Sequence, residues 1–299
     1  MTADSPMISR GGPPSYEPGT EPSRRISGEI LFENHRVRVW KLVLQPGEWF
    51  RHHRHEHDHL RFYPKPGTVA VLQGDPGDAP IATEQVLEGA VRWNDVGRNG
   101  DAVPRAVGNA GDEVLIEYTV ELLQPSQREQ ERADVGNDTF LKALAEAGPS
   151  PLVTDDAPAE PQAGDEIPTQ ISPDLLVENE LVRVWKSTMK PDTSFAWHRH
   201  LCDYLYIYTT PGHMEARVQG LEKPLSAPWD TDFVYYTEVG RKGQVPHTLR
   251  NVGGKLATHY TVEILGESRS EVEQLAEHNN RTLAGSNALD PEDLLSASR

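Results

Sequence analysis

An internal repeat constrains the fold of this chain more than any other feature of its sequence. Setting Ile26 against Ile171 aligns residues 26–67 with residues 171–212 without a gap. Roughly half of the aligned pairs are identical. The match resumes with VGRNGDAVPRAVGN against VGRKGQVPHTLRN and ends with EYTVELL against HYTVEIL. Two homologous domains, residues 26–124 and 171–265, are therefore predicted.

Both repeats have the pattern of β-strands joined by tight turns. Short runs rich in Val, Leu, Trp and Tyr, as in ILFENHRVRVWKLVLQPGEW, are separated by Pro-Gly, Gly-Asp and Asn-Gly dipeptides. This punctuation is typical of antiparallel strands. The chain has 299 residues and 36% hydrophobic content, which is enough for two domains with their own cores. The sequence therefore predicts an all-β protein.

The segments outside the repeats are predicted to be less ordered. Residues 1–25 carry Pro, Gly, Ser and Glu without periodicity, which predicts a disordered tail. Residues 125–170 combine a short amphipathic helix at Asp138 to Ala147 with a proline-rich acidic linker. Residues 266–299 repeat the helical pattern after the second domain and are predicted as a helical tail. Each domain is thus expected to carry a short accessory helix.

Charge and composition exclude several classes of partner. The formal charge of −17 argues against binding to nucleic acid or an anionic membrane, since either would need a basic surface. The single cysteine, Cys202, excludes an internal disulfide, and its simplest role is that of a small buried apolar residue. We find neither a signal-peptide pattern nor a run of membrane-spanning length. We expect a cytoplasmic protein with a small-molecule substrate.

Histidines in the second repeat predict a metal site. His198 and His200 stand two apart in SFAWHRHLCDYLYIY, which is predicted as one β-strand. Side chains alternate along a strand, so these two histidines and Tyr204 should share a face. His247, in PHTLRN, could approach from a neighbouring strand. Three imidazoles in this arrangement would bind a divalent metal.

The first repeat has a weaker version of the same cluster. His53, His55 and His59 alternate in WFRHHRHEHDHLRFY, but Arg105 stands where the second repeat has a histidine. A fixed cation beside a metal adds to the charge repulsion in the site. Two interpretations stay open. The three histidines form an incomplete or weaker metal site, or Arg105 holds an anionic group in a metal-free pocket.

The spacing of these motifs resembles the two signature motifs of the cupin superfamily, across nearly all of both repeats. The resemblance implies two tandem jelly-roll-like β-barrels, a bicupin. It also implies His198, His200 and His247 as metal ligands, with Asn251 matching the asparagine that ends the second motif. The family usually has a glutamate where this chain has Tyr204. That tyrosine could act as a fourth ligand, a hydrogen-bond donor or a proton source.

The cupin fold does not by itself select a reaction. Three neutral imidazoles suit Fe(II), Mn(II), Ni(II), Cu(II) or Zn(II). A ligand set without carboxylate resembles those of the thiol and diketone dioxygenases among cupins, so we expect a mononuclear Fe(II) oxygenase acting on a small polar metabolite. Tyr204 would orient or protonate the reacting group. A non-redox isomerase or hydrolase and a non-catalytic binding protein are the alternatives.

The repeat also bears on assembly. Cupin barrels expose sheet edges and apolar outer faces that commonly pair. Trp40 and Trp185 recur at equivalent positions and could cover such faces. We predict either a pair of barrels within one chain or a homodimer, with the homodimer favoured.

Overall fold

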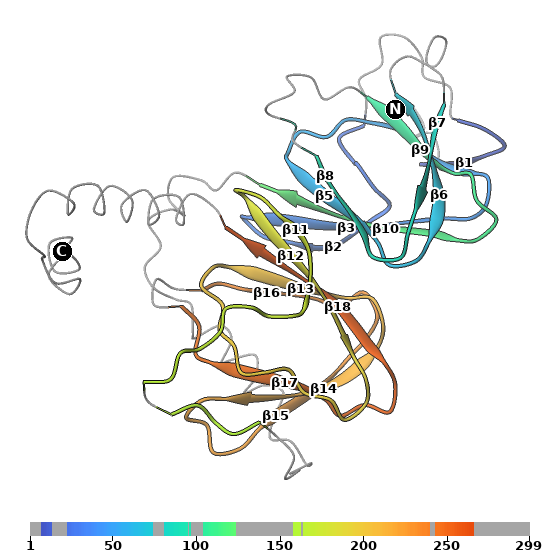
Figure 1. Cartoon of the computed structure of the whole chain (residues 1–299). Coiled ribbons are helices and arrows are strands. Elements are labelled where there is room, and N and C mark those ends of the chain that lie inside the picture. The colour runs from blue at the N-terminus through green and yellow to red at the C-terminus, as the bar shows by residue number, and fades with distance from the viewer. Residues whose placement is uncertain are drawn as a thin grey trace, which may run out of the picture.

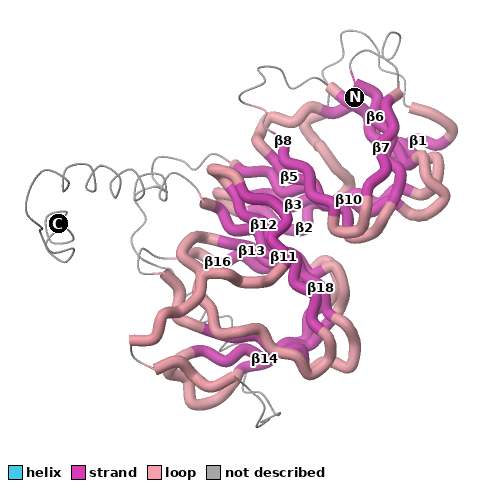
Figure 2. Tube along the Cα trace, viewed as in Figure 1, coloured by secondary structure: helices cyan, strands magenta, loops and turns pink. Residues whose placement is uncertain are grey.

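The protein is an all-β chain, as predicted. The described residues of the computed structural model form 18 strands and no helix (Figures 1 and 2). The helices predicted at 138–147 and within 266–299 lie outside the described residues. None of the described segments is a helix long and apolar enough to cross a membrane. The structure describes residues 7–13, 23–73, 81–94, 96, 104–123, 158–162, 164–239 and 243–265.

Two five-stranded antiparallel sheets make up the first domain. One has the order β1 (Ile8–Arg10), β4 (Glu48–His53), β9 (Arg105–Asn109), β6 (Gly67–Gln73) and β7 (Ala82–Val86). The other has the order β2 (Glu29–Glu33), β3 (Val37–Leu44), β10 (Leu115–Leu122), β5 (His59–Tyr63) and β8 (Ala90–Asn94). Apolar side chains of both sheets, among them Leu42, Phe50 and Val107, form one core between them. We call this pair of sheets the first barrel.

The second domain repeats this architecture. Its larger sheet has the order β11 (Asp174–Glu178), β12 (Val182–Met189), β18 (Ala257–Ile264), β13 (Tyr204–Tyr208) and β16 (Val234–Thr237). Its smaller sheet has the order β15 (Leu225–Trp229), β14 (Gly212–Val218) and β17 (His247–Asn251). We call this pair the second barrel. An irregularity recurs as well. The β2–β3 register shifts between Ile30 and Phe32, and the β11–β12 register shifts at the equivalent residues Leu175 and Val177.

The sheet of the first barrel that contains β3, β10 and β5 packs against the larger sheet of the second barrel (Figure 1). Phe62 of the first barrel stacks on Tyr260 of the second, with ring centroids 4.4 Å apart. Of the two assemblies predicted, the pair within one chain is therefore present, and the homodimer stays a prediction. One buried apolar cluster spans the interface and includes Val37, Val39, Leu60, Phe62, Tyr118, Val120, Val182, Val184, Leu205, Ile207, Tyr260 and Val262.

Part of the predicted disordered tail is ordered. Ile8–Arg10 forms β1 and pairs antiparallel with β4, and the Arg10 side chain makes an ion pair with Glu48. The edge of β4 offers unpaired backbone groups, and a short segment without periodicity can satisfy them. The prediction of disorder is therefore wrong for these residues.

The strand predicted over residues 194–208 is shorter than expected. Only Tyr204–Tyr208 forms a regular strand, β13. Upstream of it, Ser194 and His198 make isolated bridges to Arg250 and His247. These bridges hold the histidine segment against β17 without a continuous ladder. Thus the local pairing, and not a regular strand, brings the histidines of the two motifs together.

Candidate metal centre

Three histidines predicted as ligands converge inside the second barrel. One ligand atom from each of His198, His200 and His247 lies within 4.8 Å of the others, and all three side chains are buried. His198 and His247 are fixed side by side by reciprocal backbone hydrogen bonds of 3.0 and 2.9 Å. Within the described part of the chain, this is the one such group of three potential ligands. The structure thus brings together the residues that the sequence singled out.

Hydrogen bonds to backbone carbonyls orient two of these rings. His198 Nδ1 lies 2.9 Å from the Ala196 carbonyl oxygen, and His247 Nδ1 lies 3.2 Å from that of Val245. Because a carbonyl only accepts, the ring proton sits on Nδ1 and Nε2 keeps its lone pair. His198 Nε2 is buried and has no hydrogen-bond partner. A buried lone pair aimed at two other imidazoles fits a cation.

The third ring is supported by a buried carboxylate. His200 Nδ1 lies 3.4 Å from Glu263 Oε1. Glu263 also accepts from the indole of Trp185 at 3.0 Å and from Arg183 at 3.2 Å. A carboxylate behind a histidine is the usual arrangement around metal-ligating imidazoles. Sequence reasoning missed Glu263, although Glu121 and the indole of Trp40 repeat the same pair in the first barrel.

Burial keeps these histidines neutral. Desolvation lowers the pKa of His198, and it lowers the pKa of His200 and His247 well below the usual value. The charge that a protonated His198 would carry lowers the pKa of the other two further. Neutral imidazole is the form that binds metal, so the site needs no deprotonation at physiological pH.

Two tyrosines of β13 line the site, and their hydroxyls contact each other but have different further partners. The ring of Tyr204 stacks on His200 at 3.7 Å, but its hydroxyl is engaged by the Gln244 amide at 2.9 Å. The Tyr206 hydroxyl lies 3.4 Å from His200 Nε2. Strand alternation had placed Tyr204 on this face, and its catalytic role stays a prediction. Burial raises the pKa of both phenols, so they stay protonated.

A fourth histidine of this interior was missed by sequence reasoning. His259 on β18 is fully buried, with its ring 5.1 Å from that of Tyr206, and neither of its ring nitrogens has a hydrogen-bond partner. Burial lowers its pKa to about 3. The repeat contained a signal for it, because His259 begins HYTVEIL where Glu117 begins EYTVELL.

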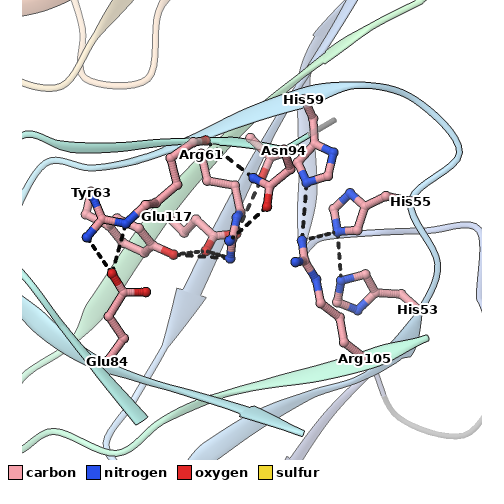
Figure 3. Close-up of polar contacts among 11 residues, drawn as sticks. His53, His55, His59, Arg61, Tyr63, Glu84, Asn94, Arg105 and Glu117 are labelled. Atoms are coloured by element: carbon pink, nitrogen blue, oxygen red, sulfur yellow. Dashed lines mark hydrogen bonds and ion pairs between the residues drawn. The ribbon is translucent and has the colours of Figure 1, made fainter. Parts of the chain in front are cut away.

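The equivalent cluster of the first barrel is built around a guanidinium. Arg105 Nη2 lies 2.6 Å from His55 Nε2 and 3.2 Å from His59 Nε2 (Figure 3). His53 Nε2 lies 3.2 Å from His55 Nε2. The four residues predicted as a second or vestigial site are therefore in contact. Arg105 is placed among these rings as His247 is placed among the histidines of the second barrel.

Among known proteins, only solved structures match this chain. No model of a known protein family matches the chain, and no curated protein does. A cupin domain from Bordetella pertussis Tohama I is 24% identical, with a TM-score of 0.28, over 34% of this chain and 98% of that one. AerE from Microcystis aeruginosa is 12% identical, with a TM-score of 0.44, over 80% of this chain and 97% of that one. A point mutant of Bacillus subtilis oxalate decarboxylase is 14% identical, with a TM-score of 0.44, over 77% of this chain and 69% of that one.

The fold itself agrees with the resemblance noted in the sequence. Each repeat forms two antiparallel sheets around one core, and the order β2-β3-β10-β5-β8 of the first barrel recurs as β11-β12-β18-β13-β16 in the second. The histidines of the two sequence motifs meet inside the second barrel. The chain therefore folds as two homologous double-sheet β-barrels, and the second barrel contains the three-histidine cluster.

Proposed function

We propose that the second barrel binds one divalent metal, Fe(II), through His198, His200 and His247, and that the protein is an oxygenase of a small anionic metabolite. The observation that carries this proposal is the convergence of three buried imidazoles. When bound, Fe(II) would supply redox chemistry with molecular oxygen. The preference for iron follows the resemblance of a ligand set without carboxylate to those of cupin dioxygenases.

The charge of the site supports an anionic substrate. Three neutral imidazoles leave the charge of a divalent cation uncompensated in a buried interior. Glu263 is the nearby carboxylate, and it already accepts from Arg183 and Trp185. A buried charge is unfavourable unless it is paired. A substrate with an ionised oxygen would compensate the positive charge of the metal, so small carboxylates are the class of compound to test.

The chain's own residues would orient that substrate. The protonated Tyr206 hydroxyl, 3.4 Å from His200 Nε2, can donate a hydrogen bond to a substrate oxygen held beside the ligands. Gln244 keeps the Tyr204 ring stacked against His200 and so holds that ligand in place. Apolar side chains such as Met214 and Leu249 limit the size of the substrate and exclude water.

Metal analysis of the purified protein tests the first half of this proposal. We expect about one metal per chain, lost in each of His198→Ala, His200→Ala and His247→Ala. The matched control is His213→Ala, because His213 lies in the same domain and its ring contacts Ser226 instead of the cluster. We expect His53→Ala to remove little metal. Two metals per chain, lost equally from both barrels, would contradict the assignment.

Oxygen uptake tests the second half. The protein would be reloaded with Fe(II) without oxygen and then mixed with a panel of small carboxylates in an oxygen electrode. We expect at least one compound to consume oxygen with the wild type and none with His247→Ala. Tight metal binding without oxygen uptake on any compound would instead favour a non-redox isomerase or hydrolase. Absence of stoichiometric metal would favour a non-catalytic binding protein.

A further inference from the structure

The interior of the first barrel contains two arginines where the second barrel has uncharged residues. Arg61 on β5 aligns with Tyr206, and Arg105 at the start of β9 aligns with His247. In Figure 3 the Arg105 guanidinium points at His55 and His59, and the Arg61 guanidinium points at Glu117. The side chain of Arg61 is only 11% exposed. The first barrel therefore has two fixed cations at the positions that His247 and Tyr206 occupy in the second barrel.

Arg61 has a carboxylate partner. Its Nη1 lies 3.7 Å from Glu117 Oε2, and its Nη2 donates to Asn94 at 3.4 Å. Glu117 also accepts a hydrogen bond of 2.6 Å from the Tyr63 hydroxyl and one of 3.2 Å from Thr119. This carboxylate balances the charge of one of the two guanidinium groups and already accepts from two hydroxyls.

Arg105 has no such partner among the described residues. Its Nη2 donates to two neutral imidazoles, and its Nε is buried without a hydrogen-bond partner. Within the described ranges no carboxylate oxygen lies within 4.0 Å of its guanidinium. Burial, and then the charge of Arg61, lower the pKa of Arg105 to about 9. The charge of Glu117 opposes this shift, but among the described residues Arg105 has no carboxylate bonded to it directly. A buried guanidinium without a bonded anion is unfavourable, which favours an added negative charge beside it.

The histidines hold this guanidinium in place. His59 Nδ1 lies 2.9 Å from the His57 carbonyl oxygen, so its Nε2 accepts from Arg105. The rings of His55 and His59 are stacked at 3.8 Å, which fixes the direction of both acceptors. Only Nη2 is used, and Nε and Nη1 remain as donors. A planar guanidinium with free donors matches the two oxygens of a carboxylate.

We propose that the first barrel is an anion site that binds a small carboxylate at Arg105, in place of the metal that its histidines would otherwise hold. Arg61 adds a second positive charge to the same interior. His55 and His59 act as hydrogen-bond acceptors that position Arg105, and His53 contacts the ring of His55. This site is distinct from the one proposed in the second barrel and does not depend on it.

Replacement of chloride by acetate at constant ionic strength tests the proposal. The probe is sodium acetate, added to the purified full chain in exchange for sodium chloride, and the readout is the melting temperature. We expect a saturable rise with acetate, because a ligand that binds only the folded state stabilises it. In Arg105→Gln, binding should weaken by about tenfold or more, the scale of losing a hydrogen bond to a charged group.

Two controls separate this site from other sources of the response. Arg10→Gln removes an arginine of the same domain whose side chain is 82% exposed, and it should leave the acetate response unchanged. His247→Gln disables the proposed metal site of the second barrel and should leave the response unchanged as well. A response that disappears in His247→Gln and survives in Arg105→Gln would place the anion in the second barrel and overturn the proposal.

The proposal has a direct structural test that does not require a variant. A crystal structure of the wild-type protein soaked in acetate should show a carboxylate within hydrogen-bond distance of Arg105. Density for water or chloride alone at that position would overturn the proposal. Acetate and chloride giving identical melting temperatures over the whole titration would overturn it too.

Discussion

Asp232 of the second domain accepts a hydrogen bond from the Tyr118 hydroxyl of the first domain. The same carboxylate makes an ion pair with Lys41, also from the first domain. Asp232 has a positive φ of 72°, and its backbone N–H donates to the Tyr208 carbonyl oxygen at 2.8 Å. One residue in a turn therefore connects the two barrels through two partners.

The equivalent turn of the first domain lacks this connection. Gly89 donates its N–H to the Tyr63 carbonyl oxygen at 2.7 Å and has a φ of 77°, so it occupies the position of Asp232. Its neighbours across the interface are Lys186 and Tyr260, which repeat Lys41 and Tyr118. The Tyr260 hydroxyl is buried and has no hydrogen-bond partner. The interface is thus symmetric in backbone and asymmetric in polar contacts.

Asp232→Asn should destabilise the protein. The substitution removes the charge that pairs with Lys41 and weakens the acceptor of the Tyr118 hydroxyl, both partly buried. We expect a loss of about 1 to 2 kcal/mol in the free energy of unfolding, measured as a lower urea midpoint. The control is Glu88→Gln, whose partner is Lys186 but whose side chain is 64% exposed, and it should cost little. Equal losses in both variants would contradict the role given to Asp232.

Gly89→Asp should introduce the missing contact. A Cβ at this position would lie 3.4 Å from Lys186 and 3.5 Å from the Tyr260 hydroxyl, which is ordinary van der Waals distance. Aspartate tolerates a positive φ better than most residues, and Asp232 already adopts it. We expect Gly89→Asp to be about 1 to 2 kcal/mol more stable than Gly89→Ala, which has the same backbone strain without the carboxylate. An advantage that persists after Tyr260→Phe and Lys186→Met would show that these partners are not its source.

Arg105→His should give the first barrel a metal site. The Nε2 atoms of His53 and His55 are already 3.2 Å apart. The substitution replaces a guanidinium that contacts His55 and His59 by an imidazole at the position equivalent to His247. We expect the metal content to rise by about one per chain relative to the wild type. Arg105→Gln removes the same charge without adding a ligand, and its metal content should stay at the wild-type value. If both variants bind the same amount of metal above the wild-type value, the loss of the positive charge alone explains the gain in metal content.

Sequence patterns predicted the parts of this protein that are local or repeated. The two domains and the clustering of His198, His200 and His247 followed from the repeat and from motif spacing, because backbone alternation limits where such side chains can lie. The strand at Ile8–Arg10 could not be predicted, since three residues without periodicity form it by pairing with β4. The partners of the buried Glu263 likewise depend on packing between strands that are distant in sequence.

The two tyrosines of β13 show where sequence prediction reaches its limit in this site. Alternation places Tyr204 and Tyr206 on the same face and cannot tell which hydroxyl approaches the ligands. That difference comes from Gln244, which lies 40 positions away in sequence from Tyr204 and engages its hydroxyl. A tertiary contact therefore sets the direction of the Tyr204 hydroxyl. Only the structure identifies Tyr206 as a candidate hydrogen-bond donor to the substrate.

The hydrogen bond between Gln244 and Tyr204 leads to different expectations for removing each of the two tyrosine hydroxyls. Under the proposed function, Tyr206→Phe should lower kcat by roughly a hundredfold, the scale of a positioned proton donor, while metal content stays unchanged. Tyr204→Phe should have a smaller effect on kcat, because its hydroxyl is bonded to Gln244 and its ring still stacks on His200. Oxygen uptake and metal content would be measured together for both variants. A larger loss of kcat in Tyr204→Phe than in Tyr206→Phe would assign the catalytic role to Tyr204, as the sequence predicted. The Tyr206 hydroxyl beside His200 Nε2 would then only line the site.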